Sequence, residues 1–153
     1  MKPADLPAYL RRLGRDLPDR AAVDAADAMA QTYQRSVVMS MKGDSAPGLP
    51  PARRTGTLAR SVRAEPAKLT GPGRAGSSVA PHTVYARIQQ LGGTIVPVRA
   101  KALRWKDKTG VHYARRVKLP PRPYMVMDDD RRREVRSAAI RAVEAVIREA
   151  LGG

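Results

Sequence analysis

The chain has 153 residues, a length at which a single domain can bury a core of its own. It contains no cysteine, which excludes disulfides, thiolate metal sites and cysteine nucleophiles, and no apolar run approaches the roughly 18 residues that a membrane span requires. The net charge of +15 indicates a polyanionic partner, either nucleic acid or the acidic face of another protein.

The apolar residues predict a thin core. Phenylalanine is absent and tryptophan occurs once, so the core must be built from Val, Leu, Ile, Ala and Met. The 13 prolines and 12 glycines predict long irregular connections between elements. We therefore expect neighbouring subunits to contribute to the stability of the fold.

Apolar residues at helical spacing predict two helices near the N-terminus. The first covers residues 4–14 and is closed by Gly14. Pro18 suits the first turn of the second, which covers residues 18–41. Residues 42–54 have the composition of a loop, either a solvated loop or an arm that reaches a neighbouring subunit.

The section that follows, residues 55–125, is predicted to be rich in strands. A short helix ends at Gly92-Gly93, because glycine tolerates the left-handed backbone that ends helices. Turn residues Asp107–Gly110 join the last two extended segments into a predicted β-hairpin, with a bulge at Arg115-Arg116. The extended segments are, in order, residues 61–67, 94–98, 102–106 and 111–119.

The C-terminal section, residues 126–153, is predicted to be mainly one helix over about 129–151, preceded by Asp128–Asp130. The extended spacer Pro120–Pro123 leads into it. Together these patterns predict one domain over residues 1–153 with an α+β fold. It has N-terminal helices, an antiparallel β-sheet with basic hairpins, and a C-terminal helix packed on the sheet.

Each residue pattern that could carry chemistry also has a structural explanation. Residues 71–76 match G-x-G-x-x-G, but no buried strand precedes them and no helix follows, so they predict a hairpin connection rather than a nucleotide site. Asp128–Asp130 can cap a helix without a metal. His82 and His112 lack partners at metal-site or triad spacing. We therefore expect no catalytic residue, no metal, no cofactor and no enzyme.

The excess of positive charge lies in the middle of the chain, where residues 51–128 hold sixteen lysines and arginines and three acidic residues. Such a basic hairpin can lie along phosphates, pair with an acidic protein ring, or simply form a solvated face. Single-strand binders add stacking aromatic side chains, whereas Trp105 and Tyr113 are expected here to face inward, Trp105 as a core or subunit-interface residue. This favours the acidic protein. The basic residues on or near the predicted hairpin are Arg104, Lys106, Lys108, Arg115, Arg116 and Lys118.

Four short motifs occur in a fixed order along the chain. They are Thr55–Leu58 (TGTL), Tyr85–Gly93 (YARIQQLGG), Lys101–Trp105 (KALRW) and Arg122–Tyr124 (RPY). Over roughly residues 20–150 the series resembles the tail-completion family of tailed bacteriophages, also described as virion morphogenesis or minor tail components. The chain departs from the family pattern at Leu91, where an aromatic residue is usual, and near Gln89, where an acid or histidine is frequent.

The resemblance implies a virion structural protein at the head–tail junction, or neck, of a phage. It would complete or terminate the tail tube as a hexameric ring for head attachment, after assembly in the host cytoplasm. That location agrees with the lack of a signal-peptide core at the N-terminus. The implied partners are copies of the chain, neighbouring neck and tail-tube proteins and, transiently, genomic DNA; none is a membrane.

Specific residues are expected to make the characteristic turns and contacts. Thr55, Gly56, Leu58, Gly92 and Gly93 are assigned to turns of the fold, and Arg122, Pro123 and Tyr124 to a subunit contact, with loss of ring assembly expected in Tyr124→Ala. Two other functions fit the residues: a small basic nucleic-acid-binding module, and a head-closure or adaptor protein of the same neck.

Overall fold

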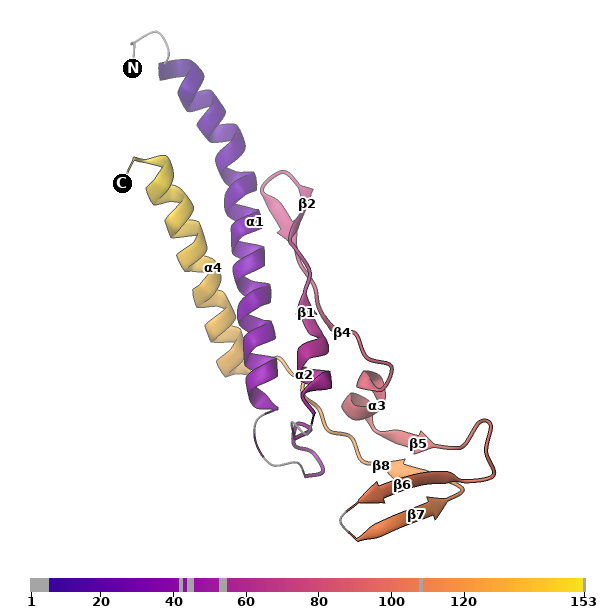
Figure 1. Ribbon diagram of the computed structural model, residues 1–153. Coiled ribbons are helices and arrows are strands. Elements are labelled where there is room, and N and C mark those ends of the chain that lie inside the picture. Colours follow the sequence, from indigo (N-terminus) through magenta and orange to yellow (C-terminus); the bar gives the residue numbers. More distant parts are fainter. Residues whose placement is uncertain (1–5, 42, 44–45, 53–54, 108, 153) are drawn as a thin grey trace.

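The computed structural model describes residues 6–41, 43, 46–52, 55–107 and 109–152, and its fold is α+β, as the sequence predicts (Figure 1). The helices are α1 (Leu6–Ser40), α2 (Thr57–Ser61), α3 (Ala86–Leu91) and α4 (Asp129–Ala150). The strands are β1 (Val62–Ala64), β2 (Lys68–Gly71), β3 (Arg74–Gly76), β4 (Val79–Pro81), β5 (Gly93–Ile95), β6 (Leu103–Asp107), β7 (Gly110–Ala114) and β8 (Val117–Leu119).

Two long antiparallel helices, α1 and α4, form the most extensive contact between elements (Figure 1). With 35 residues, α1 is about 52 Å long at 1.5 Å per residue. It lies between α4 on one side and the strands β1 to β4 on the other. Helix α1 is therefore the central layer of the fold, with α4 on one side and the strands on the other.

The N-terminus differs from the prediction of two helices, because α1 runs without a break through Gly14 and Pro18. A proline inside a helix removes one backbone donor, and its ring crowds the carbonyl group four residues earlier. That carbonyl belongs to Gly14, which has the most adaptable backbone. The contact with α4 begins just beyond this point, where Arg20 donates to Glu149 at 2.5 Å. Tertiary packing therefore outweighs the local stop signals.

The start of α4 is fixed by side chains of its own first turn, as the sequence predicts. Asp128 is the N-cap, and its carboxylate accepts a hydrogen bond from the backbone N–H of Arg131 at 2.8 Å. Asp129 and Asp130 lie in the first turn, where negative charge favours the positive end of the helix dipole. Capping and dipole complementation thus account for the acidic triplet.

The strands form separate two-stranded antiparallel pairs within the described residues, rather than one continuous sheet: β1 with β4, β2 with β3, β5 with β8, and β6 with β7. Two predicted segments change accordingly. The segment 61–67 contributes only β1, because Ser61 ends α2. The segment 111–119 breaks at Arg115-Arg116 into β7 and β8, which pair with different partners. At Arg115-Arg116, where a bulge was expected, the chain therefore passes from the β6–β7 ribbon to the β5–β8 ribbon.

One cluster of buried side chains lies where the C-terminal end of α1 meets α2, β1 and the segment before α4. They are Val37, Met41, Ala59, Val62 and Tyr124. Gln34 fixes β1 against α1 by donating from its amide to the carbonyl oxygen of Val62 at 2.9 Å. This cluster, which we call the α1-end core, organises the chain around it.

Gly92 makes the tightest turn, between α3 and β5. Its φ of 69° and ψ of −176° lie in a region open almost only to glycine. A Cβ at Gly92 would meet the backbone N of Pro121 at 2.7 Å and the carbonyl oxygen of Leu119 at 2.8 Å. Gly93 also has a positive φ, of 153°. The predicted role of this pair as a turn is confirmed.

We expect Gly92→Ala to lower the free energy of unfolding by at least roughly 1–3 kcal/mol, because it adds backbone strain and a clash with backbone atoms that cannot move aside. Urea denaturation followed by circular dichroism measures this. Gly14→Ala is the control, because a Cβ at Gly14 meets nothing within 4 Å, and alanine stabilises a helix interior by about 1 kcal/mol over glycine. Equal stabilities for the two variants would contradict the assignment of strain to Gly92.

Candidate functional site

Residues 93–119 form a lobe at the end of the molecule away from the free ends of α1 and α4 (Figure 1). We call it the distal lobe. It contains two ribbons, β5 paired with β8 from Gly93↔Leu119 to Ile95↔Val117, and β6 paired with β7. None of its described residues is buried. The lobe therefore has two separate ribbons and no buried core among its described residues.

The register of the β6–β7 hairpin sorts its side chains onto two faces. Arg104 lies opposite Tyr113, and Lys106 lies opposite Val111, so these four share one face. The other face carries Leu103 with Ala114 and Trp105 with His112, and the pair Asp107 with Gly110 closes the ribbon at the turn. We call the first the cationic face and the second the apolar face.

The apolar face is organised around Trp105. The Trp105 ring stacks on the His112 imidazole, with ring centroids 5.3 Å apart and an interplanar angle of 20°. A hydrogen bond of 2.9 Å joins the His112 Nε2 to the Thr109 hydroxyl. His112 thus supports the Trp105 ring across the strands.

The structure corrects the expectation that Trp105 and Tyr113 both face inward. Trp105 is 40% exposed, Tyr113 is 67% exposed, and the two lie on opposite faces of the hairpin. The physical reason is that a two-stranded ribbon without a further layer packed on it has no inside. Tyr113 consequently shares the cationic face with Arg104 and Lys106, whereas the sequence predicted that it faces inward.

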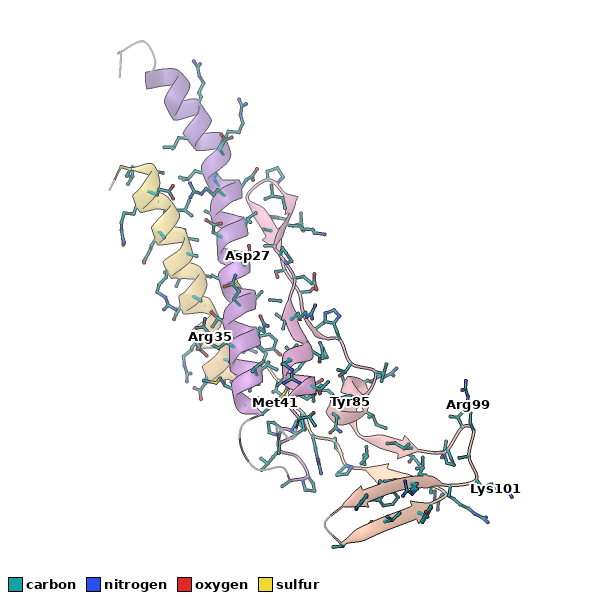
Figure 2. All side chains as sticks on the ribbon, viewed as in Figure 1. Asp27, Arg35, Met41, Tyr85, Arg99 and Lys101 are labelled. Carbon is teal, nitrogen blue, oxygen red and sulfur yellow. The ribbon has the colours of Figure 1, made fainter. Side chains whose placement is uncertain are left out.

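The distal lobe concentrates exposed positive charge. Of the predicted set, Lys108 lies outside the described residues, and the other members are exposed: Arg104, Lys106, Arg115, Arg116 and Lys118. Arg99 and Lys101 add to them from the loop between β5 and β6, at the outer edge of the lobe (Figure 2). The basic turn at residues 99–101 was visible in the sequence, but only the fold shows that it belongs with the hairpin.

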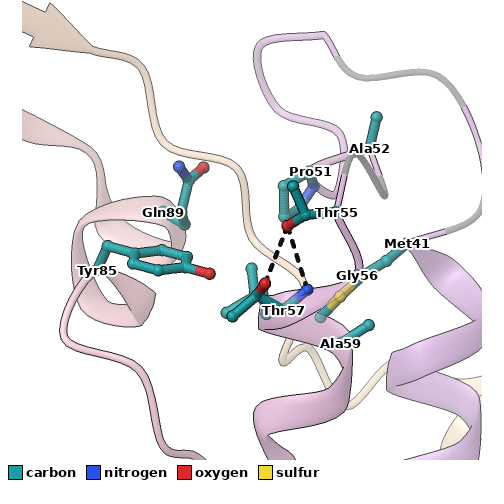
Figure 3. A pocket seen from close by; sticks show the side chains of 10 residues that line it. Met41, Pro51, Ala52, Thr55, Gly56, Thr57, Ala59, Tyr85 and Gln89 are labelled. Carbon is teal, nitrogen blue, oxygen red and sulfur yellow. Dashed lines mark hydrogen bonds between the residues drawn. The ribbon is translucent and has the colours of Figure 1, made fainter.

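The other three motifs converge at one place, although they are far apart in the sequence. Thr55 to Leu58 begin α2, and Tyr85 and Gln89 come from the N-cap and first turn of α3; together with Met41 they line a cavity of about 150 Å³ (Figure 3). The backbone carbonyl oxygen of Gln89 also accepts a hydrogen bond from the backbone N–H of Arg122, at 2.8 Å. We call this meeting point the motif junction.

The turn at Thr55–Leu58 has the local geometry of a helix start. Gly56 is the N-cap residue of α2, with a φ of 77°. The Thr55 hydroxyl accepts a hydrogen bond from the backbone N–H of Thr57 at 3.4 Å and lies 3.0 Å from the Thr57 hydroxyl (Figure 3). The cavity beside it is smaller than the roughly 300–1,000 Å³ of typical ligand pockets. These residues fit a structural role.

The structure also corrects the expected subunit contact at Tyr124. Tyr124 is only 1% exposed and belongs to the α1-end core, so its side chain is not available to a neighbouring chain. Gln90 holds this segment in place, because its Oε1 accepts from the backbone N–H groups of Tyr124 at 3.0 Å and Met125 at 3.1 Å. Gln90 lies in the YARIQQLGG motif, but nothing in the sequence indicated this bond. Arg122 and Pro123 are partly exposed.

The remaining candidates have local structural roles. Residues 71–76 form the turn and second strand of the β2–β3 hairpin, in line with the predicted hairpin connection, and Gly73 in the turn has a φ of 62°. His82 is half exposed and lies 3.7 Å from the Glu65 carboxylate. Within the described ranges, no group of His, Asp and Glu side chains is arranged to hold a metal ion. None of the helices there combines the length and hydropathy of a bilayer-spanning segment.

Comparisons with known proteins found no matching protein-family model, no similar curated protein and no similar solved structure. The function is therefore argued from the residues and their arrangement.

We expect Tyr124→Ala to lower the free energy of unfolding by about 3–5 kcal/mol, because it empties the centre of the α1-end core. Tyr124→Phe is the control and costs less than about 1 kcal/mol, since it removes only a long hydrogen bond of 3.4 Å from the hydroxyl to the carbonyl oxygen of Ala86. Urea denaturation of both variants measures this. A Tyr124→Ala variant as stable as the parent would restore the subunit-contact interpretation.

We also expect stability to fall in alkali. Burial raises the pKa of Tyr33 and of Tyr124 above the ordinary value of 10.0. The neutral phenols stabilise the fold fully below that value, and this stabilisation is lost as the pH rises through the folded-state pKa values. The melting temperature measured against pH should fall less steeply in Tyr124→Phe than in a control with an exposed tyrosine replaced, Tyr113→Phe. Equal slopes would contradict the assignment.

Proposed function

We propose that the chain is a structural subunit of a phage neck, which completes or terminates the tail tube as a hexameric ring to which the head attaches. The proposal includes its location in the virion after assembly in the host cytoplasm, and a mechanism of surface complementarity without covalent chemistry. It starts from the ordered series of four motifs that resembles the tail-completion family.

The observation that carries the proposal is the distal lobe without a core. An isolated two-stranded ribbon is marginally stable in water and needs further strands or a packed helix. The described residues of 93–119 include exposed and half-buried side chains but no buried one. A subunit whose lobe gains its missing layer from a neighbour has the stability of an assembly rather than of a monomer.

The total exposed surface supports the same conclusion. A compact monomer of 16.7 kDa is expected to expose about 7,600 Å², whereas this chain exposes 11346 Å². The excess reflects long, thin elements that leave apolar side chains in contact with water. In and around α3 and the distal lobe these are Val84, Tyr85, Leu91, Val96, Val98, Trp105, Val111 and Tyr113. Apolar side chains exposed in this way are available for contacts between proteins.

The convergence of three motifs at the motif junction suits a subunit in which one part stabilises the fold and another part contacts the neighbouring subunit. The junction and the α1-end core hold the body together, and the turn at Gly92 sets the direction in which the distal lobe leaves it. The apolar face of the hairpin, with Trp105 at its centre, is then the surface offered to a neighbouring subunit. The fourth motif, Lys101–Trp105, contributes this residue.

We expect Trp105→Ala to reduce ring assembly at least about tenfold while leaving the melting temperature of the body unchanged, because the side chain stabilises no described core. Light scattering after size-exclusion chromatography and negative-stain microscopy measure assembly, with sixfold rings expected from six 16.7-kDa chains. Tyr113→Ala is the matched control, since it removes an aromatic ring from the opposite face of the same hairpin.

Two results would contradict the proposal. One is a parent chain that stays monomeric at every soluble concentration and in the presence of tail tubes from its own phage. The other is an equal loss of assembly in the Trp105 and Tyr113 variants, which would show that the apolar face is not the contact surface.

A further inference from the structure

The cationic face of the β6–β7 hairpin places two cations and an aromatic ring together in solvent. Arg104 and Lys106 are two residues apart on β6, which is about 7 Å along a strand. Tyr113 lies directly opposite Arg104 and is 67% exposed. At this separation the two cations lie within the Debye length of about 8 Å at physiological salt, so they repel each other in the free chain.

The cations of the distal lobe differ from those at the start of α4 in their ion pairing. On α4, Arg131, Arg132 and Arg133 each pair with the aspartate three residues earlier. No such ion pair joins the basic side chains of the lobe to an acid among the side chains that the structure describes. The lobe residues concerned are Arg99, Lys101, Arg104, Lys106, Arg115, Arg116 and Lys118.

This pattern favours nucleic acid over an acidic protein as the partner. The centre of a protein–protein contact is depleted of charged residues overall and of lysine, although arginine is enriched there. Protein–nucleic acid contacts are much more positively charged. The lobe carries its exposed cations on the hairpin, in the adjoining β8 segment and in the loop at its outer edge, where Figure 2 labels Arg99 and Lys101. A continuous polyanion can contact such a distribution at many points.

We propose that the cationic face and the surrounding basic side chains of the distal lobe bind the phosphate backbone of duplex DNA without reading its sequence. A two-stranded β-ribbon fits the major groove of B-DNA, which is about 12 Å wide. In that position Arg104 and Lys106 reach phosphates, and Tyr113 packs against the sugar–phosphate edge. The inference does not rest on the proposed ring, because it follows from the charge and register of one chain.

The test is fluorescence anisotropy of a labelled duplex of mixed sequence, titrated with the full chain over a series of salt concentrations. We expect sub-micromolar affinity to persist near 0.15 M salt, with a linear dependence of log affinity on log salt whose slope reports the number of phosphate contacts. A second duplex of unrelated sequence should bind equally.

Two triple variants with the same change in net charge sharpen the test. The first, Arg104→Gln with Lys106→Gln and Arg116→Gln, removes cations of the lobe. It should weaken binding near 0.15 M salt at least about tenfold and reduce the salt slope by about 0.9 for each phosphate that is no longer neutralised. The control removes exposed cations of α4, by Arg136→Gln with Arg141→Gln and Arg148→Gln, and should change affinity less than about twofold.

Circular dichroism must show that both triple variants keep the fold of the parent. Equal weakening by the two triples would overturn the proposal, because binding would then reflect net charge alone. Loss of all duplex binding near 0.15 M salt would also overturn it and would assign the basic lobe to an acidic protein partner. Ring assembly can be measured on the same samples, so failure of this inference is distinguishable from failure of the proposed function.

Discussion

The packing of Tyr124 into the C-terminal end of α1 is the interaction on which the rest of the structure depends. Tyr124 follows the distal lobe in the chain and precedes α4, so its burial fixes both elements to α1 at once. Gln90 reinforces this point by accepting two backbone hydrogen bonds from the segment that carries the ring. Because α3 supplies Gln90 and then turns sharply at Gly92, the direction of the lobe is determined by the same contacts that close the core.

This arrangement separates a body that has a core from a lobe whose described side chains are all exposed or half-buried. The body is built from α1, α4 and the strands β1 to β4 that pack on α1, whereas the lobe exposes both faces of the β6–β7 ribbon. The two faces differ in chemistry, because the strand period places Trp105 on one and Arg104 with Lys106 on the other. One hairpin can therefore offer an apolar surface to a neighbouring subunit and a cationic surface to a polyanion without the two competing for the same side chains.

The distribution of charge separates the paired arginines of α4 from the cations of the distal lobe. The arginines at the start of α4 each pair with the aspartate one turn earlier. The pairs of Arg132 and Arg133 are solvent-exposed and contribute little to stability, whereas the Arg131 side chain is 13% exposed and also donates to the backbone carbonyl oxygens of Tyr124 and Val126. The cations of the distal lobe have no such described partners, and they surround an exposed tyrosine. A phage neck is a place where a protein ring and DNA meet, so the proposed ring and the proposed DNA contact are compatible, although each has its own test.

The sequence by itself determined the features whose causes are local: the capped helix after Asp128, the turn at Gly92-Gly93 and the β6–β7 hairpin. Each depends on residues within one turn or one ribbon. Only the tertiary structure decided the continuity of α1 through Pro18, the burial of Tyr124 and the exposure of Tyr113. These depend on what lies on the far side of each residue: α4 supports the helix, the α1-end core covers Tyr124, and no described layer covers the ribbon. Spacing along the chain carries no information about such neighbours.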